Sequence, residues 1–230
     1  MKLGIVAGGF KPLTSGHFGK IALSTIECDK TLLLYSEAGR SSAGGVEITS
    51  DQIKKMWTIL KPMLTETFGD KLIVKDASPW PVSAVYGIIK CTTRCETHVI
   101  KSERLRARKF LKNFGIDSTP SHITVYGSQE DLQDRFISFV EKGLSRKMFD
   151  MTYDDGKLSF SSGDGKIINS VKSFYQDVPT NKIIKAVSVR GTEVREMMMT
   201  KDPDVSLVLP PIFRDQDTIN EFIDIFRRSA

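Results

Sequence analysis

The residues best suited to chemistry lie in a glycine-rich turn near the N-terminus, GGFKPLTSGH over Gly8–His17. An apolar run at 3–7 precedes the turn and apolar residues at helical spacing follow it, which predicts a strand, a turn and a helix. Gly8 and Gly9 permit a close approach of backbone to a ligand, because neither has a Cβ. A helix N-terminus also directs N–H groups and the positive end of its dipole at one point, so this turn predicts an anion site.

Thr14 and His17 are three residues apart and are therefore neighbours on the first turn of the predicted helix. Gly16 lies between them and leaves room above the turn, while Phe10 and Lys11 belong to the preceding loop. A hydroxyl, an imidazole and free amides at a helix N-terminus suit a polyphosphate. The alternative is an ordinary strand–helix turn in which His17 only caps the helix or packs.

Two later junctions repeat this pattern. The strand predicted at 122–126 ends at Gly127 and Ser128, before a helix that begins near 129. An apolar run at 183–187 is predicted as the last strand of the sheet, and the segment SVRGTEVR over Ser188–Arg195 then opens a helix. Thr192 and Arg195 share the first turn of that helix and can both reach one phosphate group. The alternative is a threonine N-cap and a surface arginine.

The elements that must position these residues alternate between strand and helix. Strands are predicted at 3–7, 30–35, 71–75, 122–126 and 183–187, which indicates one α/β domain over 1–230 with a parallel sheet and helices on both faces. Residues 145–181 break the alternation and predict a β-hairpin insertion with a short helix at 168–175. Helical spacing also predicts a C-terminal helix at 218–228. Ligands bind at the carboxyl edge of such sheets, where the mobile loop expected at 36–46 also lies.

Composition narrows the class of protein. The chain has 230 residues and a net charge of +5, which suits anionic substrates without requiring nucleic acid. No run of 18 apolar residues is present, so we expect no membrane span, and the N-terminus has no signal-peptide pattern. Three cysteines indicate free thiols in a reducing compartment, hence a cytoplasmic protein. The spacing of Cys91, Cys95 and His98 does not fit a zinc site, and we expect no protein-held metal.

Two further features have two interpretations each. Trp80 is held between Pro79 and Pro81 in a loop after a strand, where it would either stack on a heterocycle or cover the sheet edge. The helix predicted around 102–112 is rich in Lys and Arg. We favour a solvated face for this basic helix over a nucleic-acid surface, because no aromatic residues are interleaved with its cations. Trp57 lies on an apolar helical stripe and is predicted in the core.

The turn residues also resemble a known family. Phe10-x-Pro12-x-Thr14-x-Gly16-His17 is similar to the (H/T)xGH signature of the nucleotidylyltransferase superfamily, and Gly191-Thr192-x-Val194-Arg195 is similar to its C-terminal ISSTxxR-like motif. Arg190 stands where the family usually has a small Ser. Phe10-x-Pro12 resembles the adenylyltransferase branch, which acts on nicotinamide mononucleotide or pantetheine phosphate, and in particular short phage-type members. The resemblance implies a Rossmann-like doubly wound sheet with strand order 3-2-1-4-5.

The resemblance also implies a reaction. AMP would pass from ATP to a phosphate-bearing small molecule, with nicotinamide mononucleotide as our first choice and NAD as its product, and pyrophosphate would leave. His17, Lys11 and Arg195 would be catalytic, and Trp80 would bind the acceptor. Mg²⁺ would be held mainly through substrate phosphates. The nucleotide-binding residues would be Gly8, Gly9, Phe10, Thr14, Gly16, Gly127, Ser128, Ser188 and Thr192.

Other classes stay open at this point. A cytidylyltransferase acting on a sugar or alcohol phosphate would use the same turns. A nucleic-acid-binding protein would use the basic helix, a relative of the aminoacyl-tRNA synthetases would share the HxGH-like turn, and a binding protein would keep the fold without catalysis. Assembly into a homo-oligomer is compatible with the sequence.

Overall fold

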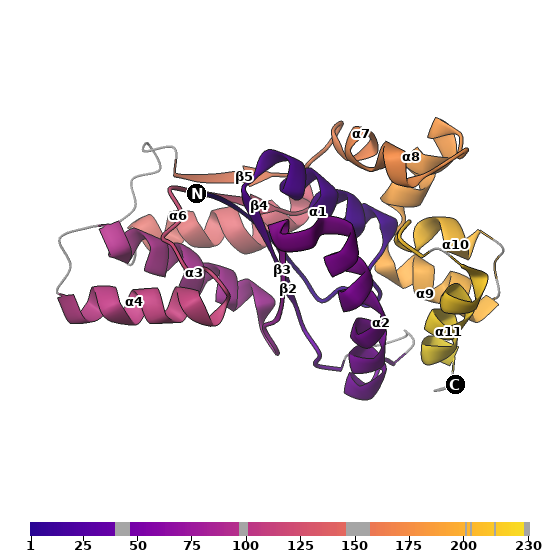
Figure 1. The fold of residues 1–230 in the computed structure, drawn as a ribbon, viewed down its shortest axis with the longest axis horizontal. Helices are drawn as coiled ribbons and strands as arrows, with labels where there is room; N and C mark the ends of the chain where they lie inside the picture. Colours follow the sequence, from indigo (N-terminus) through magenta and orange to yellow (C-terminus); the bar gives the residue numbers. More distant parts are fainter. Residues whose placement is uncertain are drawn as a thin grey trace.

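The computed structural model describes residues 1–39, 47–96, 101–145, 157–200, 202, 204–213 and 215–227. These residues form one parallel sheet of five strands in the order β3-β2-β1-β4-β5 (Figure 1). The strands are β1 (Lys2–Ala7), β2 (Lys30–Tyr35), β3 (Leu72–Asp76), β4 (His122–Tyr126) and β5 (Leu158–Ser161). The sheet confirms a Rossmann-like α/β fold with the expected order 3-2-1-4-5.

The fifth strand is not the predicted one. Residues 183–187 were expected to form it, but they lie in helix α8 (Thr180–Ser188), which buries Ile183 and Ala186 and leaves Ile184 48% exposed. A short apolar run does not distinguish a strand from a helix, and here helical spacing decides. Leu158–Ser161 was assigned to the hairpin insertion and instead pairs in parallel with β4. Residues 146–156 of the predicted hairpin insertion lie outside the described residues. The same holds for residues 40–46 of the loop expected at 36–46, and for the side chains of Cys95 and His98.

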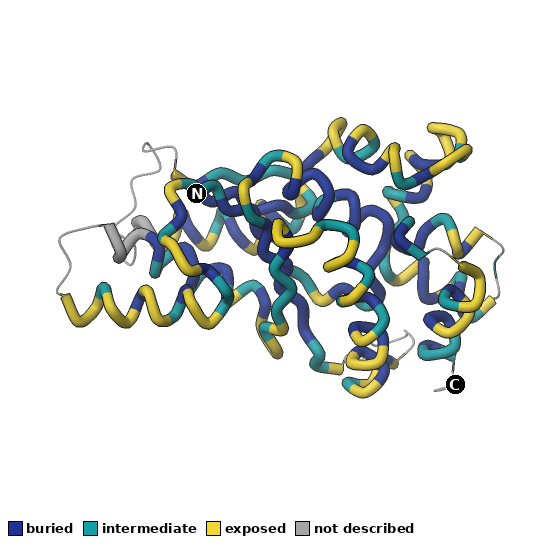
Figure 2. The backbone as a smooth tube through the Cα atoms, in the orientation of Figure 1, coloured by how far each residue is buried: buried dark blue, intermediate teal, exposed yellow. Residues whose placement is uncertain are grey.

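Alternating strand residues build two cores, one on each face of the sheet. Leu32 and Leu34 of β2 point into one core, and Leu33 and Tyr35 into the other. The core with Leu33 contains α1 (Ser15–Glu27), α2 (Ser50–Phe68) and residues from the C-terminal helices. The opposite core contains α3 (Pro81–Glu96), α4 (Lys101–Asn113) and the helical segment α5 (Gln129–Asp131), η2 (Leu132–Ile137) and α6 (Ser138–Ser145). Figure 2 shows the buried strands between these layers.

The C-terminal helices extend one side of the molecule (Figure 1). They are α7 (Ile167–Val171), η4 (Lys172–Phe174), α8, α9 (Gly191–Thr200), α10 (Val205–Val208) and α11 (Gln216–Arg227), while η1 (Gly69–Lys71) precedes β3. α7 and α8 pack on α1, and α11 packs on α2 and α9. The short helix predicted near 168–175 is observed as α7 and η4, and the predicted C-terminal helix is observed as α11, which the structure describes as far as Arg227. Among the described residues, no helix has the length and apolar character needed to cross a bilayer.

Candidate active site

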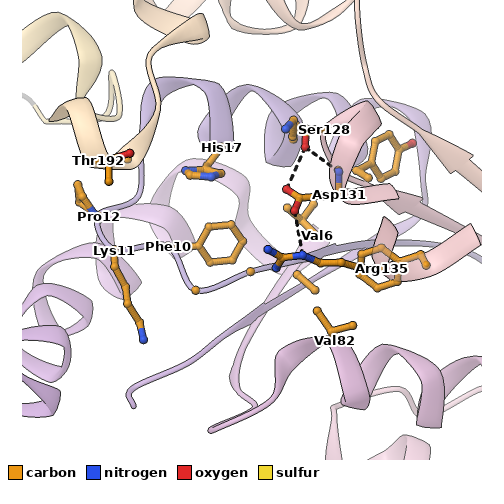
Figure 3. A pocket seen from close by; sticks show the side chains of 18 of the residues that line it. Val6, Phe10, Lys11, Pro12, His17, Val82, Ser128, Asp131, Arg135 and Thr192 are labelled. Atoms are coloured by element: carbon orange, nitrogen blue, oxygen red, sulfur yellow. Dashed lines mark hydrogen bonds and ion pairs between the residues drawn. The ribbon is translucent and has the colours of Figure 1, made fainter. Parts of the chain in front are cut away.

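A cavity of about 300 Å³ lies at the C-terminal ends of β1 and β4 (Figure 3). The N-terminal parts of α1 and α9 contribute His17 and Thr192 to its walls. The two predicted turns therefore meet in one cavity, although more than 170 positions separate His17 from Thr192. The second turn follows helix α8, which packs on α1, and not a strand of the sheet. The predicted site residues that line the cavity are Gly8, Gly9, Phe10, Lys11, His17, Gly127, Ser128, Thr192 and Arg195.

His17 and Thr14 form a reciprocal cap at the start of α1. The backbone N–H of Thr14 donates to Nδ1 of His17 over 3.2 Å, and the backbone N–H of His17 donates to Oγ1 of Thr14 over 3.4 Å. Because Nδ1 accepts a hydrogen bond, the neutral ring carries its proton on Nε2. The cap that starts the helix thus also fixes the tautomer of His17, and leaves Nε2–H as a donor for a ligand oxygen.

The environment keeps this imidazole neutral. The pKa of His17 is lowered to about 4, mainly by burial and also by the nearby Lys20 ammonium, while the Asp131 carboxylate acts in the opposite direction. A charged imidazole would lose its hydration in this position, which disfavours protonation. At neutral pH, His17 is therefore a neutral hydrogen-bond donor.

The ring of Phe10 packs against the ring of His17. Its side chain is buried and its ring meets that of His17 edge-on, with centroids 5.0 Å apart. On its other side it contacts Trp57, which is 1% exposed and packs on Tyr35, so the prediction of Trp57 in the core is confirmed. The backbone of Phe10 has φ of 45°, a conformation that costs a non-glycine residue free energy unless packing holds it. The buried ring supplies that packing.

Arg195 connects the two turns directly. Its side chain is only 6% exposed, and Nη1 donates to the backbone oxygen of Lys11. The expected alternative of a surface arginine is therefore wrong for this residue. The ammonium of Lys11 in turn donates to the backbone oxygen of Ala38. A buried guanidinium in the cavity wall is both a structural link and a fixed positive charge.

Three charged residues of the cavity were missed by sequence reasoning. They are Lys20, Asp131 and Arg135. Asp131 accepts a hydrogen bond from Ser128 over 2.9 Å and pairs with Arg135 over 3.1 Å (Figure 3). Burial lowers the pKa of Lys20, which the Asp131 carboxylate opposes. The spacing of Lys20, three residues after His17 on one helix face, was the signal that could have found it.

The charges of the lining favour an anion. Lys11, Lys20, Arg135 and Arg195 contribute four cations and Asp131 the single carboxylate, while His17 is neutral. In a partly enclosed site this excess is screened less than on an open surface. The N-termini of α1 and α9 add the positive ends of their dipoles.

Three predicted nucleotide-binding residues do not line the cavity. Thr14 is buried in the cap, and Oγ of Ser188 donates to the backbone oxygen of Lys185 over 2.8 Å. A Cβ on Gly16 would lie 2.2 Å from the backbone oxygen of Val187. The missing side chain at Gly16 thus makes room for α8 against α1, which is a packing role.

A second cavity of about 610 Å³ adjoins the first. The two share Gly8, Gly9, Lys11, Val82 and Arg135 as lining residues. Trp80 lines this second cavity and is 70% exposed, so it does not cover the sheet edge as part of a core. The rings of Tyr86 and Phe139 stack on one another in its wall at 3.7 Å.

These observations define a Rossmann-like α/β protein with a cationic cavity at its carboxyl edge and an aromatic-lined cavity next to it. Compared with known proteins, the chain matches no protein-family model and no curated sequence.

Proposed function

We propose that the protein is a nucleotidylyltransferase that transfers AMP from ATP to a phosphate-bearing small molecule and releases pyrophosphate. The observation that carries this proposal is that His17 and Arg195, from the two motifs that resemble the superfamily, line one cationic cavity. A histidine used only as a cap would not require an arginine from position 195 in the same cavity. The position at the carboxyl ends of β1 and β4 also agrees with where open α/β sheets bind ligands.

In the proposed reaction, an oxygen of the acceptor phosphate attacks the α-phosphorus of ATP. The bond from the α-phosphorus to the bridging oxygen breaks, and pyrophosphate leaves with that electron pair. No proton transfer is required, so catalysis depends on alignment and on neutralising charge. His17 would donate Nε2–H to a phosphate oxygen, while Thr192 and Arg195 would hold the β- and γ-phosphates.

Magnesium fits this arrangement. Asp131 is the single carboxylate of the lining and is already bound to Ser128 and Arg135. A Mg²⁺ ion would therefore take most of its ligands from phosphate oxygens and water, and bound there it would offset negative charge on the triphosphate.

The second cavity is our proposed acceptor site. Lys11 and Arg135 line both cavities, so in this proposal they would hold the acceptor phosphate next to the α-phosphate. Trp80 offers an exposed aromatic face farther along the same cavity, suited to stacking on a heterocycle. Nicotinamide mononucleotide has both groups and is our first choice of acceptor.

A pyrophosphate-release screen tests the proposal. Each of the four nucleoside triphosphates, with Mg²⁺, is combined with a panel of phosphorylated acceptors that includes nicotinamide mononucleotide and sugar and alcohol phosphates. We expect release with ATP and one acceptor class, and a loss of about 100-fold to 1,000-fold in kcat/KM for H17N, which keeps an acceptor near Nδ1 but removes the Nε2 donor. H17Q, which restores an N–H near that position, should recover part of the rate.

Two outcomes of this screen would contradict the proposal. Release that depends on CTP would favour a cytidylyltransferase. No acceptor-dependent release with any triphosphate, or a rate that H17N leaves unchanged, would exclude the proposed role of the cavity.

A further inference from the structure

The positive charge of the chain is concentrated in one helix. α4 carries six of the 33 Lys and Arg residues and one of the 28 Asp and Glu residues, so that 27 of each sign remain elsewhere. The whole formal net charge of +5 therefore resides in the thirteen residues of α4. This helix packs on α3 and lies at the opposite end of the molecule from α9 (Figure 1), so its charge does not serve the proposed catalytic cavity.

The cations of α4 are arranged along its outer face. Ala107 and Leu111 are buried and turn the other face toward the core. Lys101, Arg108 and Lys112 follow one another at intervals of seven and four residues, which places them in one stripe on a helix. The exposed cations of the helix are Lys101, Arg106, Arg108, Lys109 and Lys112.

These five side chains form no ion pair with a carboxylate within the described part of the chain. A row of like charges without counter-charges repels itself, and a polyanion relieves that repulsion. From Lys101 to Lys112 the stripe extends about 16 Å at the usual rise of a helix. That length corresponds to about five base pairs of duplex.

A membrane surface fits this helix less well. A helix that lies on a bilayer needs an apolar outer face, but α4 directs its apolar face at α3. Its only large hydrophobic side chain among the exposed ones is Leu105, at 69%. We therefore propose that the outer face of α4 binds the phosphate backbone of a nucleic acid, independently of the reaction in the two cavities. This proposal replaces the solvated face favoured from the sequence, because contacts to phosphates need cations and not the interleaved aromatic residues that stack on bases.

Fluorescence anisotropy with a labelled 20-nucleotide strand and its 20-base-pair duplex tests this proposal. Four phosphate contacts, by Lys101, Arg108, Lys109 and Lys112, give a slope of about −4 in log K against log salt for duplex, and about −3 for the single strand. Affinity for duplex should thus fall about 100-fold from 50 to 200 mM salt. The triple variant R108Q/K109Q/K112Q should reduce the duplex slope to about −1 and weaken binding at least 10-fold at 50 mM salt.

The matched control is K172Q/K182Q/K185Q, which removes the same charge from exposed lysines in η4 and α8. It should stay within about twofold of the wild-type affinity, and both variants should retain pyrophosphate release. Equal losses in the two variants would show that only net charge matters, which overturns the proposal. Binding that is insensitive to salt, no binding, or tighter binding to phosphatidylserine vesicles than to either oligonucleotide would overturn it as well.

Discussion

At the scale of single residues, the imidazole of His17 both caps helix α1 and presents a neutral hydrogen-bond donor to the cavity. Its Nδ1 accepts from the backbone of Thr14, its burial keeps it neutral, and its Nε2 remains for a ligand. The sequence predicted the neighbourhood of Thr14 and His17, because i,i+3 spacing is a property of any helix. It did not predict Asp131 or Arg135, whose place in the cavity depends on how β4 aligns with β1.

The lowered pKa of His17 predicts a pH-dependent stability. Between pH 6.5 and about 4, the unfolded chain binds a proton at this residue and the folded protein does not. His17 therefore lowers the free energy of unfolding by about 3 kcal/mol as pH falls through this range, and has no such effect above pH 6.5. Urea unfolding at several pH values measures this, with H17N as the comparison.

H17N should lose less stability than the wild type between pH 6.5 and 4. Other groups contribute equally in both proteins, among them Glu27, whose pKa is lowered by its hydrogen bonds to Lys166 and Tyr126 despite the opposing effect of burial. Identical pH profiles for the two proteins would show that His17 is solvated and protonates normally.

At the scale of elements, the contact between α1 and α8 sets the position of the second turn. Gly16 faces the backbone oxygen of Val187 so closely that G16A must displace one helix. We expect G16A to destabilise the protein by about 1–3 kcal/mol, the usual range for overpacking. Thermal and urea unfolding provide the measurement.

G191A is the matched control, because a Cβ at Gly191 would come no closer than 3.8 Å to the nearest heavy atoms. It should unfold close to the wild-type midpoint. A G16A variant that kept its stability and lost only nucleotide affinity would contradict the packing role. Gly16 would then be a ligand contact, as the resemblance to the nucleotidylyltransferase signature implies.

The loop that carries Trp80 makes a separate prediction. The chain has two tryptophans, of which Trp57 is buried and Trp80 is exposed in the second cavity. An acceptor that stacks on Trp80 should change its fluorescence and shift the emission, and W80F should abolish the change. W80F should also raise KM for the acceptor while KM for ATP stays the same. A full fluorescence response in W80F would place the acceptor elsewhere.

At the scale of the whole molecule, the strand order was predicted but one strand was assigned wrongly. β1, β2, β3 and β4 follow from buried runs between turn signals, which are local features. Leu158–Ser161 is short and half polar, and only its pairing with β4 makes it a strand. The short apolar run at 183–187 is compatible with a strand or a helix, and in the structure it is a helix that buries Ile183 and Ala186 at helical spacing and packs on α1.

This difference also changes how the site is assembled. The second turn was expected after a sheet strand, but it lies between helices α8 and α9, of which α8 packs on α1. The meeting of His17 and Arg195 thus depends on the contacts of α8 with α1 and of Arg195 with the backbone of Lys11. Such long-range contacts are not visible in any local pattern of residues.

The central claim is that the two turns hold one chain of phosphates, and calorimetric titration with Mg·ATP and Mg·AMP tests it most directly. T192V removes a hydroxyl at nearly constant shape, and H17N removes the Nε2 donor. The account predicts that each variant weakens Mg·ATP binding about 10-fold, corresponding to about 1.4 kcal/mol, and that T192V leaves Mg·AMP binding unchanged because AMP lacks the β- and γ-phosphates. Wild-type affinity for Mg·ATP in both variants, or no binding of Mg·ATP by the wild type, would contradict it.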